Sequence, residues 1–263
     1  MVRSIPRWLP AGVAALALAG CAAREQWTEP VTGMQFVLVP AGRFVMGSPP
    51  GERDREAQEV AHPVDIAEPF WVGRYEVTQG EWVRVMGSNP SRFADCGVRC
   101  PVEQVSHDDI ERFLERLADL SVQRFRLPTE AEWEYACRAG TTTAFAFGEE
   151  LSSTDANIDD QPGDRIGAPG PGNATVPVGS FRANAWGLHD FHGNVWEWTS
   201  DRHCPYLASA DDPSCDDLLV IRGGSWHFGA DSARCALRYT HAPEDSGPSL
   251  GFRLVRDRRP AVR

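Results

Sequence analysis

Residues 186–201, with the sequence WGLHDFHGNVWEWTSD, constrain the fold most because they alternate large aromatic rings with carboxylates. Tryptophan belongs to cores and interfaces, and a carboxylate buried among such rings is costly unless it is paired or bound to a metal. Asp190 and Glu197, with the carbonyl oxygens of Gly193 and Val195 between them, offer the oxygen ligands that Ca²⁺ prefers. The pattern favours a loop folded around calcium. The alternative is a turn in which Asp190 and Glu197 cap backbone N–H groups.

Residues 1–20 are predicted to be an export signal. Arg3 and Arg7 precede a short apolar run at 11–19, and the segment ends in Leu-Ala-Gly before Cys21. This ending resembles a bacterial lipobox, which predicts cleavage before Cys21, lipidation of its thiol and a membrane anchor. Since Ala22 rather than aspartate follows, the expected location is the outer membrane, facing the periplasm or the cell surface, with residues 21–33 as a tether. The alternative is an ordinary secretory signal with a chance cysteine.

The six remaining cysteines also indicate an exported protein. An even number of cysteines in such a domain favours disulfides, although six allow 15 pairings. Short separations favour Cys96–Cys100 and Cys204–Cys215, which leaves Cys137 and Cys235 as a long-range pair. A zinc site is the alternative, but paired C-x₂-C units are missing.

The charge composition excludes several functions. The net charge of −11 argues against a nucleic-acid partner, because phosphate binding needs a basic face. All 26 basic residues are arginine, so neither a Schiff-base lysine nor a Walker-type lysine exists. Residues 257–263 form a basic tail, which we interpret as a solvated chain end.

Hydrophobic periodicity and capping residues predict a single α+β domain at 34–256. Two β runs around Pro40 indicate a hairpin-like start, followed by strands at 62–66 and 70–77 and closing strands at 219–226 and 251–255. Thr78, Ser106 and Thr129 are predicted helix N-caps, and Gly140 is the expected end of the third helix. Residues 140–218 show little regular structure, so calcium and disulfides are expected to hold them in place.

Several motifs resemble the formylglycine-generating enzyme (sulfatase-modifying factor) family, whose members have an irregular, loop-rich α+β fold of the C-type-lectin-like kind. The motifs lie at residues 36–48, 75–78, 101–106, 126–136, 177–179, 184–188, 193–198, 222–226 and 251–253. The resemblance implies that Asp190, Gly193, Val195 and Glu197 hold a structural Ca²⁺.

The resemblance also implies two further features. A second calcium site of the family matches Asn157 and Ile158, with Asp159, Asp160 or Asp164 as its uncertain acidic partner. The structural disulfide of the family corresponds to Cys137–Cys235.

One departure from the family pattern bears on function. Formylglycine-generating enzymes oxidise a sulfatase cysteine with a copper-binding cysteine pair soon after the Gly-Gly-Ser motif. Residues 227–234 of this chain, HFGADSAR, contain no cysteine, so the soft Cu(I) site is missing and copper or iron is not expected. Formylglycine generation is therefore the least favoured function.

Two other functions remain open. The first is a calcium-stabilised binding or scaffold lipoprotein with a protein or envelope-polymer partner. The second is a periplasmic metal-dependent oxidoreductase, resembling the family members that act in siderophore (pyoverdine) maturation, with His227 and His241 as candidate metal or proton-transfer groups. The candidate pocket residues are Trp196, Ser225, Trp226, His227, Arg234, Arg238 and His241.

Overall fold

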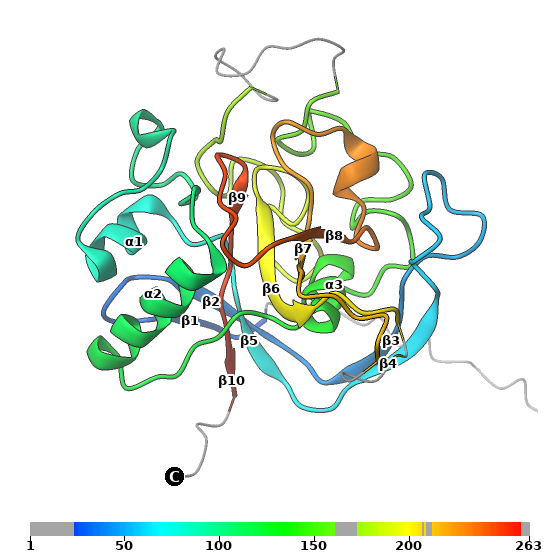
Figure 1. The fold of residues 1–263 in the computed structure, drawn as a ribbon, viewed down its shortest axis with the longest axis horizontal. Helices are drawn as coiled ribbons and strands as arrows, with labels where there is room; N and C mark the ends of the chain where they lie inside the picture. The colour runs from blue at the N-terminus through cyan, green and yellow to red at the C-terminus, as the bar shows by residue number, and fades with distance from the viewer. Residues whose placement is uncertain (1–23, 161–172, 207, 209–211, 259–263) are drawn as a thin grey trace, which may run out of the picture.

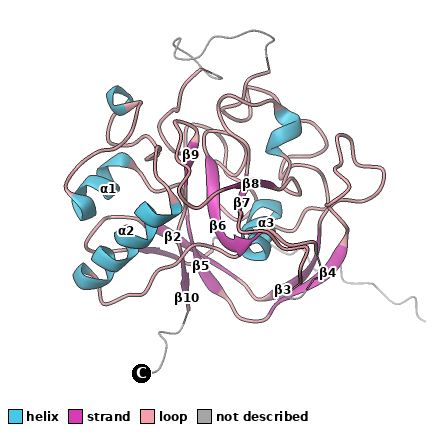
Figure 2. Cartoon of the chain, viewed as in Figure 1, coloured by secondary structure: helices cyan, strands magenta, loops and turns pink. Residues whose placement is uncertain are grey.

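The computed structural model describes residues 24–160, 173–206, 208 and 212–258 (Figure 1). Cys21 and Asp164, which carry the predicted lipid anchor and one candidate calcium ligand, lie outside these residues. The fold is α+β, as predicted, and most of the described chain is loop (Figure 2). No helix in the described part is long and apolar enough to cross a membrane.

The first sheet has the strand order β1 (Gln26–Thr28), β2 (Gln35–Val39), β5 (Phe70–Gly73) and β10 (Val255–Asp257), all antiparallel. The predicted hairpin of the first two β runs is wrong. Strand β3 (Gly42–Met46) leaves this sheet and pairs with β4 (His62–Ile66). Residues 26–28, within the predicted tether, form a strand of the domain.

The two central strands of the first sheet, β2 and β5, are buried on both faces. Phe36 of β2 belongs to one core cluster with Phe113 and Phe252, whereas its neighbour Val37 belongs to a second cluster with Trp133. Successive side chains of a strand point to opposite faces, so β2 links the two clusters.

A second four-stranded sheet has the order β8 (Tyr239–His241), β7 (Leu219–Arg222), β6 (Trp196–Arg202) and β9 (Leu250–Gly251). Strand β6 runs through the second half of the Trp-rich stretch, which was predicted to be a loop. It pairs antiparallel with β7 and parallel with β9. The prediction failed because Trp196, Glu197 and Trp198 are all buried, so no alternation of apolar and polar residues marks the strand.

All three predicted helix starts are confirmed. Capping boxes at Thr78, Ser106 and Thr129 open α1 (Gln79–Met86), α2 (His107–Leu120) and α3 (Glu130–Arg138). The left-handed residue that ends α3 is Ala139, one position before the predicted Gly140. Helices α1 and α2 pack together at one end of the molecule, and β3 and β4 lie at the other (Figure 1).

Three disulfides join the pairs predicted from spacing: Cys96–Cys100, Cys137–Cys235 and Cys204–Cys215. The pair Cys137–Cys235 connects α3 to the segment after the short helix η2 (Ala230–Ala233), across 98 positions of sequence. The other two close short loops, η1 (Ala94–Cys96) being part of the first.

Candidate functional site

The carboxylate of Glu197 lies in strand β6 and is fully buried. Arg253 donates two hydrogen bonds of 2.6 Å, from Nε to Oε2 and from Nη2 to Oε1, and the indole Nε1 of Trp133 donates to Oε2 at 2.7 Å. A bidentate arginine is the strongest partner that a buried carboxylate can have. The structure therefore gives Glu197 a paired environment that the sequence did not reveal.

Glu76 is also buried, and it lies close enough to the carboxylates of Asp190 and Glu197 for their negative charges to act on it. Its Oε2 accepts a hydrogen bond from Asn194 at 2.9 Å, whereas its Oε1 is buried without a partner. Burial, followed by the charges of Asp190 and Glu197, raises the pKa of Glu76 well above its usual value. Desolvation likewise raises the pKa of Asp190 to about 6, although Asp190 accepts a 2.7 Å hydrogen bond from the amide of Gly179.

The donor chemistry of this acidic cluster suits a hard cation, although Glu76, Asp190 and Glu197 do not bring three carboxylate oxygens within 4.8 Å of one another. Its three carboxylates face the single guanidinium of Arg253, and the orphaned Glu76 oxygen lacks a positive partner. Calcium accepts mixed carboxylate and carbonyl oxygens, so Asp190, Glu197 and the carbonyls of Gly193 and Val195 have suitable chemistry. Glu197 would have to share its oxygens between Arg253 and the ion.

Gly193 fixes the position of this stretch against the loop at 157–158. An added Cβ at Gly193 would lie 2.2 Å from the carbonyl oxygen of Asn157, and the glycine has a φ of +78°. The backbone N–H of Asn194 donates to the same carbonyl at 2.8 Å. Asn157 and Ile158, the candidates for a second calcium, are buried. The side-chain Nδ2 of Asn157 donates to Oδ1 of Asn194 and to the carbonyl oxygen of Ala174.

A cleft of about 430 Å³ opens beside the second sheet. Trp196 forms its aromatic wall, stacked on Tyr239 with ring centroids 5.6 Å apart and in edge contact with Phe228 at 5.6 Å. Trp196 is almost fully buried, whereas Phe228 and Tyr239 are 38% and 53% exposed. The cleft therefore presents aromatic surface to an incoming molecule.

The rim of the cleft is acidic. Asp54, Glu56 and Asp231 line it with exposed side chains. The one arginine of the cleft, Arg238, is buried and already paired through Nε with Glu130 at 2.6 Å. The charged segment at 48–61 thus supplies two of the acidic groups, Asp54 and Glu56. Its sole sequence signal is a high density of charge.

Of the seven predicted pocket residues, Trp196 and Arg238 line the cleft, and the other five lie outside its lining. Arg234 is buried in an ion pair with Glu59 and Glu52, and Trp226 donates its Nε1–H to the carbonyl of Pro248. Ser225 is fully buried and its Oγ has no partner.

The two candidate histidines, His227 and His241, lie outside the lining of the cleft. His227 is exposed beside the rings of Trp226 and Phe228, and His241 pairs with Asp245 at 3.0 Å. Among the described residues, no group of three potential metal ligands within 4.8 Å of one another includes either histidine.

Comparisons with known proteins identify the family. The sequence model of the Sulfatase-modifying factor enzyme 1-like domain matches residues 22–258. Formylglycine-generating enzyme of Bos taurus is 37% identical, over 89% of this chain and 78% of that protein. Serine/threonine-protein kinase pkn1 of Chlamydia caviae is 29% identical over 84% of this chain, which spans only 38% of the kinase.

A solved structure supports the same assignment. PvdO from Pseudomonas aeruginosa superposes with a TM-score of 0.76 and 30% identity, covering 89% of this chain and 98% of that structure. Together with the disulfide, capping and Trp-rich motifs, these matches show that the chain belongs to the sulfatase-modifying factor (formylglycine-generating enzyme) family and has its fold.

Proposed function

We propose that this chain is an exported, lipid-anchored member of the family that binds a partner of the cell envelope and does not generate formylglycine. The observation that carries this proposal is the state of the thiols. All six cysteines of the described chain are joined in disulfides. The segment after Gly223-Gly224-Ser225, where the family resemblance implies a copper-binding cysteine pair, has an exposed His227 and Phe228 instead.

The aromatic cleft supports binding as the activity. Aromatic rings at the centre of a surface depression are typical of binding hot spots, because they bury a large area at low conformational cost. Trp196 is rigidly packed, and Phe228 and Tyr239 extend its surface outward. The acidic rim of Asp54, Glu56 and Asp231 favours a partner with neutral or cationic groups.

Calcium has a structural part in this proposal. Asp190, Glu197 and the carbonyl oxygens of Gly193 and Val195 would hold the ion, with Glu76 as a neighbouring charge that it would neutralise. Bound there, calcium would link the first half of the Trp-rich stretch, at Asp190 and Gly193, to Glu197 of strand β6 and so hold Trp196 at the cleft. Lipidation at Cys21 would place the cleft at the membrane surface.

The first experiment tests the exclusion of formylglycine generation. The full chain with Cys21→Ser is incubated with a sulfatase-derived cysteine peptide, Cu(I) and oxygen, and the aldehyde is measured by mass spectrometry. Formylglycine-generating enzyme of Bos taurus is the positive control. We expect no aldehyde above the level without protein. Turnover by the chain would refute the proposal.

The second experiment tests binding at the cleft, using co-sedimentation of the same protein with isolated cell envelopes. We expect the double variant Phe228→Ala/Tyr239→Ala to lose roughly 30-fold or more of its affinity, because even one hot-spot aromatic contributes about 2 kcal/mol or more. Val122→Ala, which changes a 94% exposed side chain elsewhere, is the control. Equal sedimentation of both variants would exclude the cleft as the binding surface.

A metal-dependent oxidoreductase is the second candidate, favoured by the similarity to PvdO over almost the whole length of that structure. In this case His227 and His241 would be metal or proton-transfer groups at the edge of the cleft. Elemental analysis of the purified protein after exposure to copper and iron separates the two functions. Stoichiometric copper or iron that is lost in His227→Ala or His241→Ala would favour the oxidoreductase, and calcium alone would favour the binding protein.

A further inference from the structure

His203 lines the aromatic cleft, and the proposed function gives it no part. Its ring Nδ1 lies 3.0 Å from Oδ2 of Asp216, and its Nε2 lies 3.3 Å from Oε1 of Gln58. A neutral imidazole has one N–H group and one lone pair, whereas an imidazolium has two N–H groups. Both contacts are hydrogen bonds at the same time only if both oxygens accept and His203 carries two protons.

Both oxygens are acceptors. Gln58 donates from its Nε2 to the carbonyl oxygen of Arg238 at 3.4 Å, and this bond directs its Oε1 towards His203. Desolvation acts to raise the pKa of Asp216, but hydrogen bonds from His203 and from the backbone N–H of Leu218 lower it below the usual value. Asp216 is therefore an ionised carboxylate at neutral pH, which accepts hydrogen bonds only. The partners of His203 thus require the imidazolium.

A neutral His203 would leave an unfavourable contact whichever way Gln58 turns. The carboxylate of Asp216 would keep the N–H of Nδ1, so Nε2 would present its lone pair to Oε1 of Gln58. Turning the Gln58 amide over would direct its NH₂ group at Nε2, but would bring its oxygen towards the carbonyl oxygen of Arg238. Two acceptors that face each other repel, and neither gains a hydrogen bond. Loss of one proton from His203 therefore breaks its link to Gln58.

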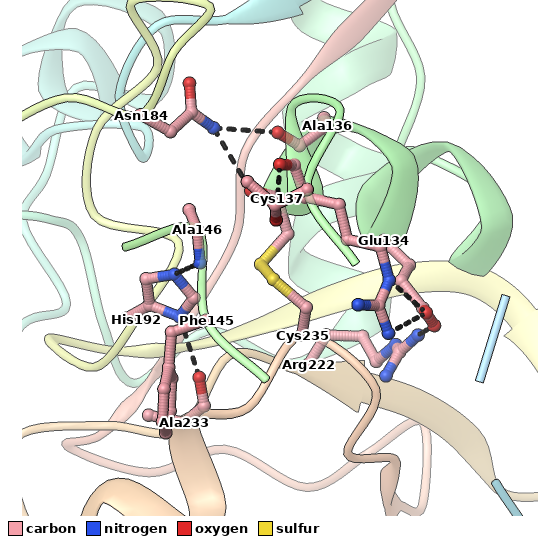
Figure 3. Close-up of a disulfide and its surroundings, with 12 residues drawn as sticks. Glu134, Ala136, Cys137, Phe145, Ala146, Asn184, His192, Arg222, Ala233 and Cys235 are labelled. Atoms are coloured by element: carbon pink, nitrogen blue, oxygen red, sulfur yellow. Dashed lines mark hydrogen bonds and ion pairs between the residues drawn. A yellow bond between two sulfur atoms is a disulfide. The ribbon is translucent and has the colours of Figure 1, made fainter. Parts of the chain in front are cut away.

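His192, beside the disulfide Cys137–Cys235, shows the opposite arrangement (Figure 3). The backbone N–H of Ala146 donates to its Nε2 at 3.1 Å, and its Nδ1 lies 2.7 Å from the carbonyl oxygen of Ala233. One donor and one acceptor match a neutral ring, and burial lowers the pKa of His192 to about 4. The hydrogen-bond partners therefore distinguish this neutral histidine from His203, whose partners require two protons.

The Asp216 side of His203 is fixed by covalent and backbone bonds. The disulfide Cys204–Cys215 joins the residues directly next to His203 and Asp216, and the backbone N–H of Asp216 donates to the carbonyl oxygen of His203 at 3.2 Å. Gln58, in contrast, belongs to the charged segment at 48–61, which supplies part of the acidic rim of the cleft. A change of protonation at His203 therefore acts on this segment and not on Asp216.

The charged segment has a second anchor, which does not involve His203. Arg234 pairs with Glu52 at 2.8 Å and with Glu59 at 2.7 Å, and all three side chains are buried. Glu52 and Glu59 enclose residues 53–58 in sequence. The segment therefore stays attached on both sides of residues 53–58 when the bond between His203 and Gln58 is lost, and the change is confined to the part that lines the cleft.

We propose that His203 is a proton-controlled switch of the cleft. With two protons it holds Gln58 and the acidic residues of the charged segment at the cleft wall, and with one proton it releases them. Histidine is the side chain that ordinarily changes its charge between pH 5 and 8, so the held state belongs to the acidic end of this range. The consequence for partner binding rests on the proposed function, whereas the switch itself does not.

Other charged and titratable groups surround His203. They are Asp54 and Glu56 of the charged segment, Asp231 of η2, Arg202 of β6, Tyr206, Asp216 and Asp217 of the segment after β6, and Arg238 before β8. The two arginines are already paired, Arg202 with Asp217 and Arg238 with Glu130. Among the described residues that line the cleft, His203 is the only histidine.

The test follows the full chain with Cys21→Ser by NMR from about pH 8 to about pH 5. We expect the ring protons of His203 and the side-chain amide protons of Gln58 to shift with one common midpoint. The backbone amides of residues 53–58 should become less mobile on the picosecond-to-nanosecond timescale as the pH falls through this midpoint. Separate midpoints, or equal mobility at both ends of the range, would overturn the proposal.

Three variants and one control assign the effect to the two hydrogen bonds. His203→Gln removes the titrating group, and Gln58→Met removes the acceptor while His203 still titrates, so the segment should stay mobile at every pH in both. His203→Arg keeps a positive charge with donors for Asp216 and Gln58, so the segment should stay held at every pH. His107→Gln, at a histidine 3.8 Å from Glu111, should leave the response unchanged. A pH response that persists in His203→Gln or Gln58→Met would contradict the proposal.

Co-sedimentation with cell envelopes then tests whether the switch controls the cleft. The parent should bind roughly fivefold more tightly at about pH 5.5 than at about pH 7.5, which is the effect of one ordinary hydrogen bond, and His203→Gln should show no such difference. If Phe228→Ala/Tyr239→Ala binds as the parent does at both pH values, the proposed function fails, whereas the NMR response still supports the switch. Binding at the cleft that does not change with pH would refute its control by His203.

Discussion

Arg253 binds both carboxylate oxygens of Glu197, each at 2.6 Å, where neither side chain contacts solvent. The same guanidinium donates to the carbonyl oxygens of Gly73 and His189 and lies over the ring of Phe191 at 3.7 Å. One side chain from the segment between β9 and β10 thus connects the first sheet, the Trp-rich stretch and strand β6. The acidic cluster keeps its position because Arg253 fixes its centre.

Removing Arg253 should be strongly destabilising. Arg253→Met leaves the buried Glu197 charge unpaired, and breaking such a pair on one side costs about 3–5 kcal/mol. Urea unfolding measures the loss. Arg202→Met breaks the exposed pair Arg202–Asp217 and should cost less than about 1 kcal/mol. A similar small loss for both variants would mean that Arg253 does not hold the cluster.

Calcium should stabilise the fold through the same cluster. At a free calcium concentration of 100 times Kd, binding to the folded state alone adds about 2.7 kcal/mol to the free energy of unfolding. We expect the Tm to rise with added calcium, to fall with chelator, and to become insensitive to calcium in Asp190→Ala. Asp216→Ala, at an exposed carboxylate, is the control. A calcium-independent Tm in the parent protein would refute the calcium site.

Glu103 should make stability depend on pH. Burial raises its pKa to about 7, and its Oε2 has no partner, although Oε1 accepts a hydrogen bond from the amide of Phe93 at 2.8 Å. The folded state therefore retains a proton that the unfolded state loses above its ordinary pKa of 4.5. The stabilisation from protonated Glu103 is complete below pH 4.5 and is lost as the pH rises to 7.

The expected loss is on the order of 3 kcal/mol, from about 1.4 kcal/mol for each unit of pKa difference. Glu103→Gln has no such proton, so the difference in unfolding free energy between it and the parent should grow from pH 4.5 to 7. Glu115→Gln, on an exposed part of α2, controls for the general effect of charge. A constant difference over this range would show that Glu103 does not titrate as inferred.

Gly193 should not tolerate a side chain, for two separable reasons. Gly193→Ala meets the Asn157 carbonyl oxygen at 2.2 Å and also places alanine at a φ of +78°. Gly187→Ala places alanine at a similar φ of +80°, with no atom within 4 Å of the new Cβ. Left-handed backbone alone costs about 1–2 kcal/mol. We expect this loss for Gly187→Ala and a clearly larger one for Gly193→Ala in urea unfolding, whereas equal losses would exclude the steric contact.

Local chemistry explains which elements could be predicted. Thr78, Ser106 and Thr129 each exchange hydrogen bonds with the residue three positions later. Both partners of each cap are therefore close enough in sequence to be recognised without a structure. The short disulfides follow the same logic, because Cys96 and Cys100 are only four positions apart. The predicted hairpin failed because β2 and β3 are neighbours in sequence but find their partners, β5 and β4, further along the chain.

The candidate site depended more on tertiary contacts. Asp190 and Glu197 could be identified as unusual from their aromatic neighbours, but Glu197 meets Arg253 across 56 positions of sequence. The cleft combines Trp196 of β6, Tyr239 of β8 and the loop residues Asp54 and Glu56. No spacing rule connects these segments, and the predicted set therefore included Arg234, which instead pairs with Glu59.

The sequence by itself determined the α+β class, the helix starts, the cysteine pairs and the family motifs. The helix caps, the motifs and the two short disulfides depend on residues a few positions apart. The third disulfide follows because only two cysteines are then left to pair. The tertiary structure alone decided that Glu197 lies in a strand, that Glu76 joins the acidic cluster, and that His192 lies beside Cys137–Cys235. The physical reason is that each of these environments is built from side chains far apart in sequence. Only the packing of the sheets and helices against one another brings their charges and lone pairs within reach of one another.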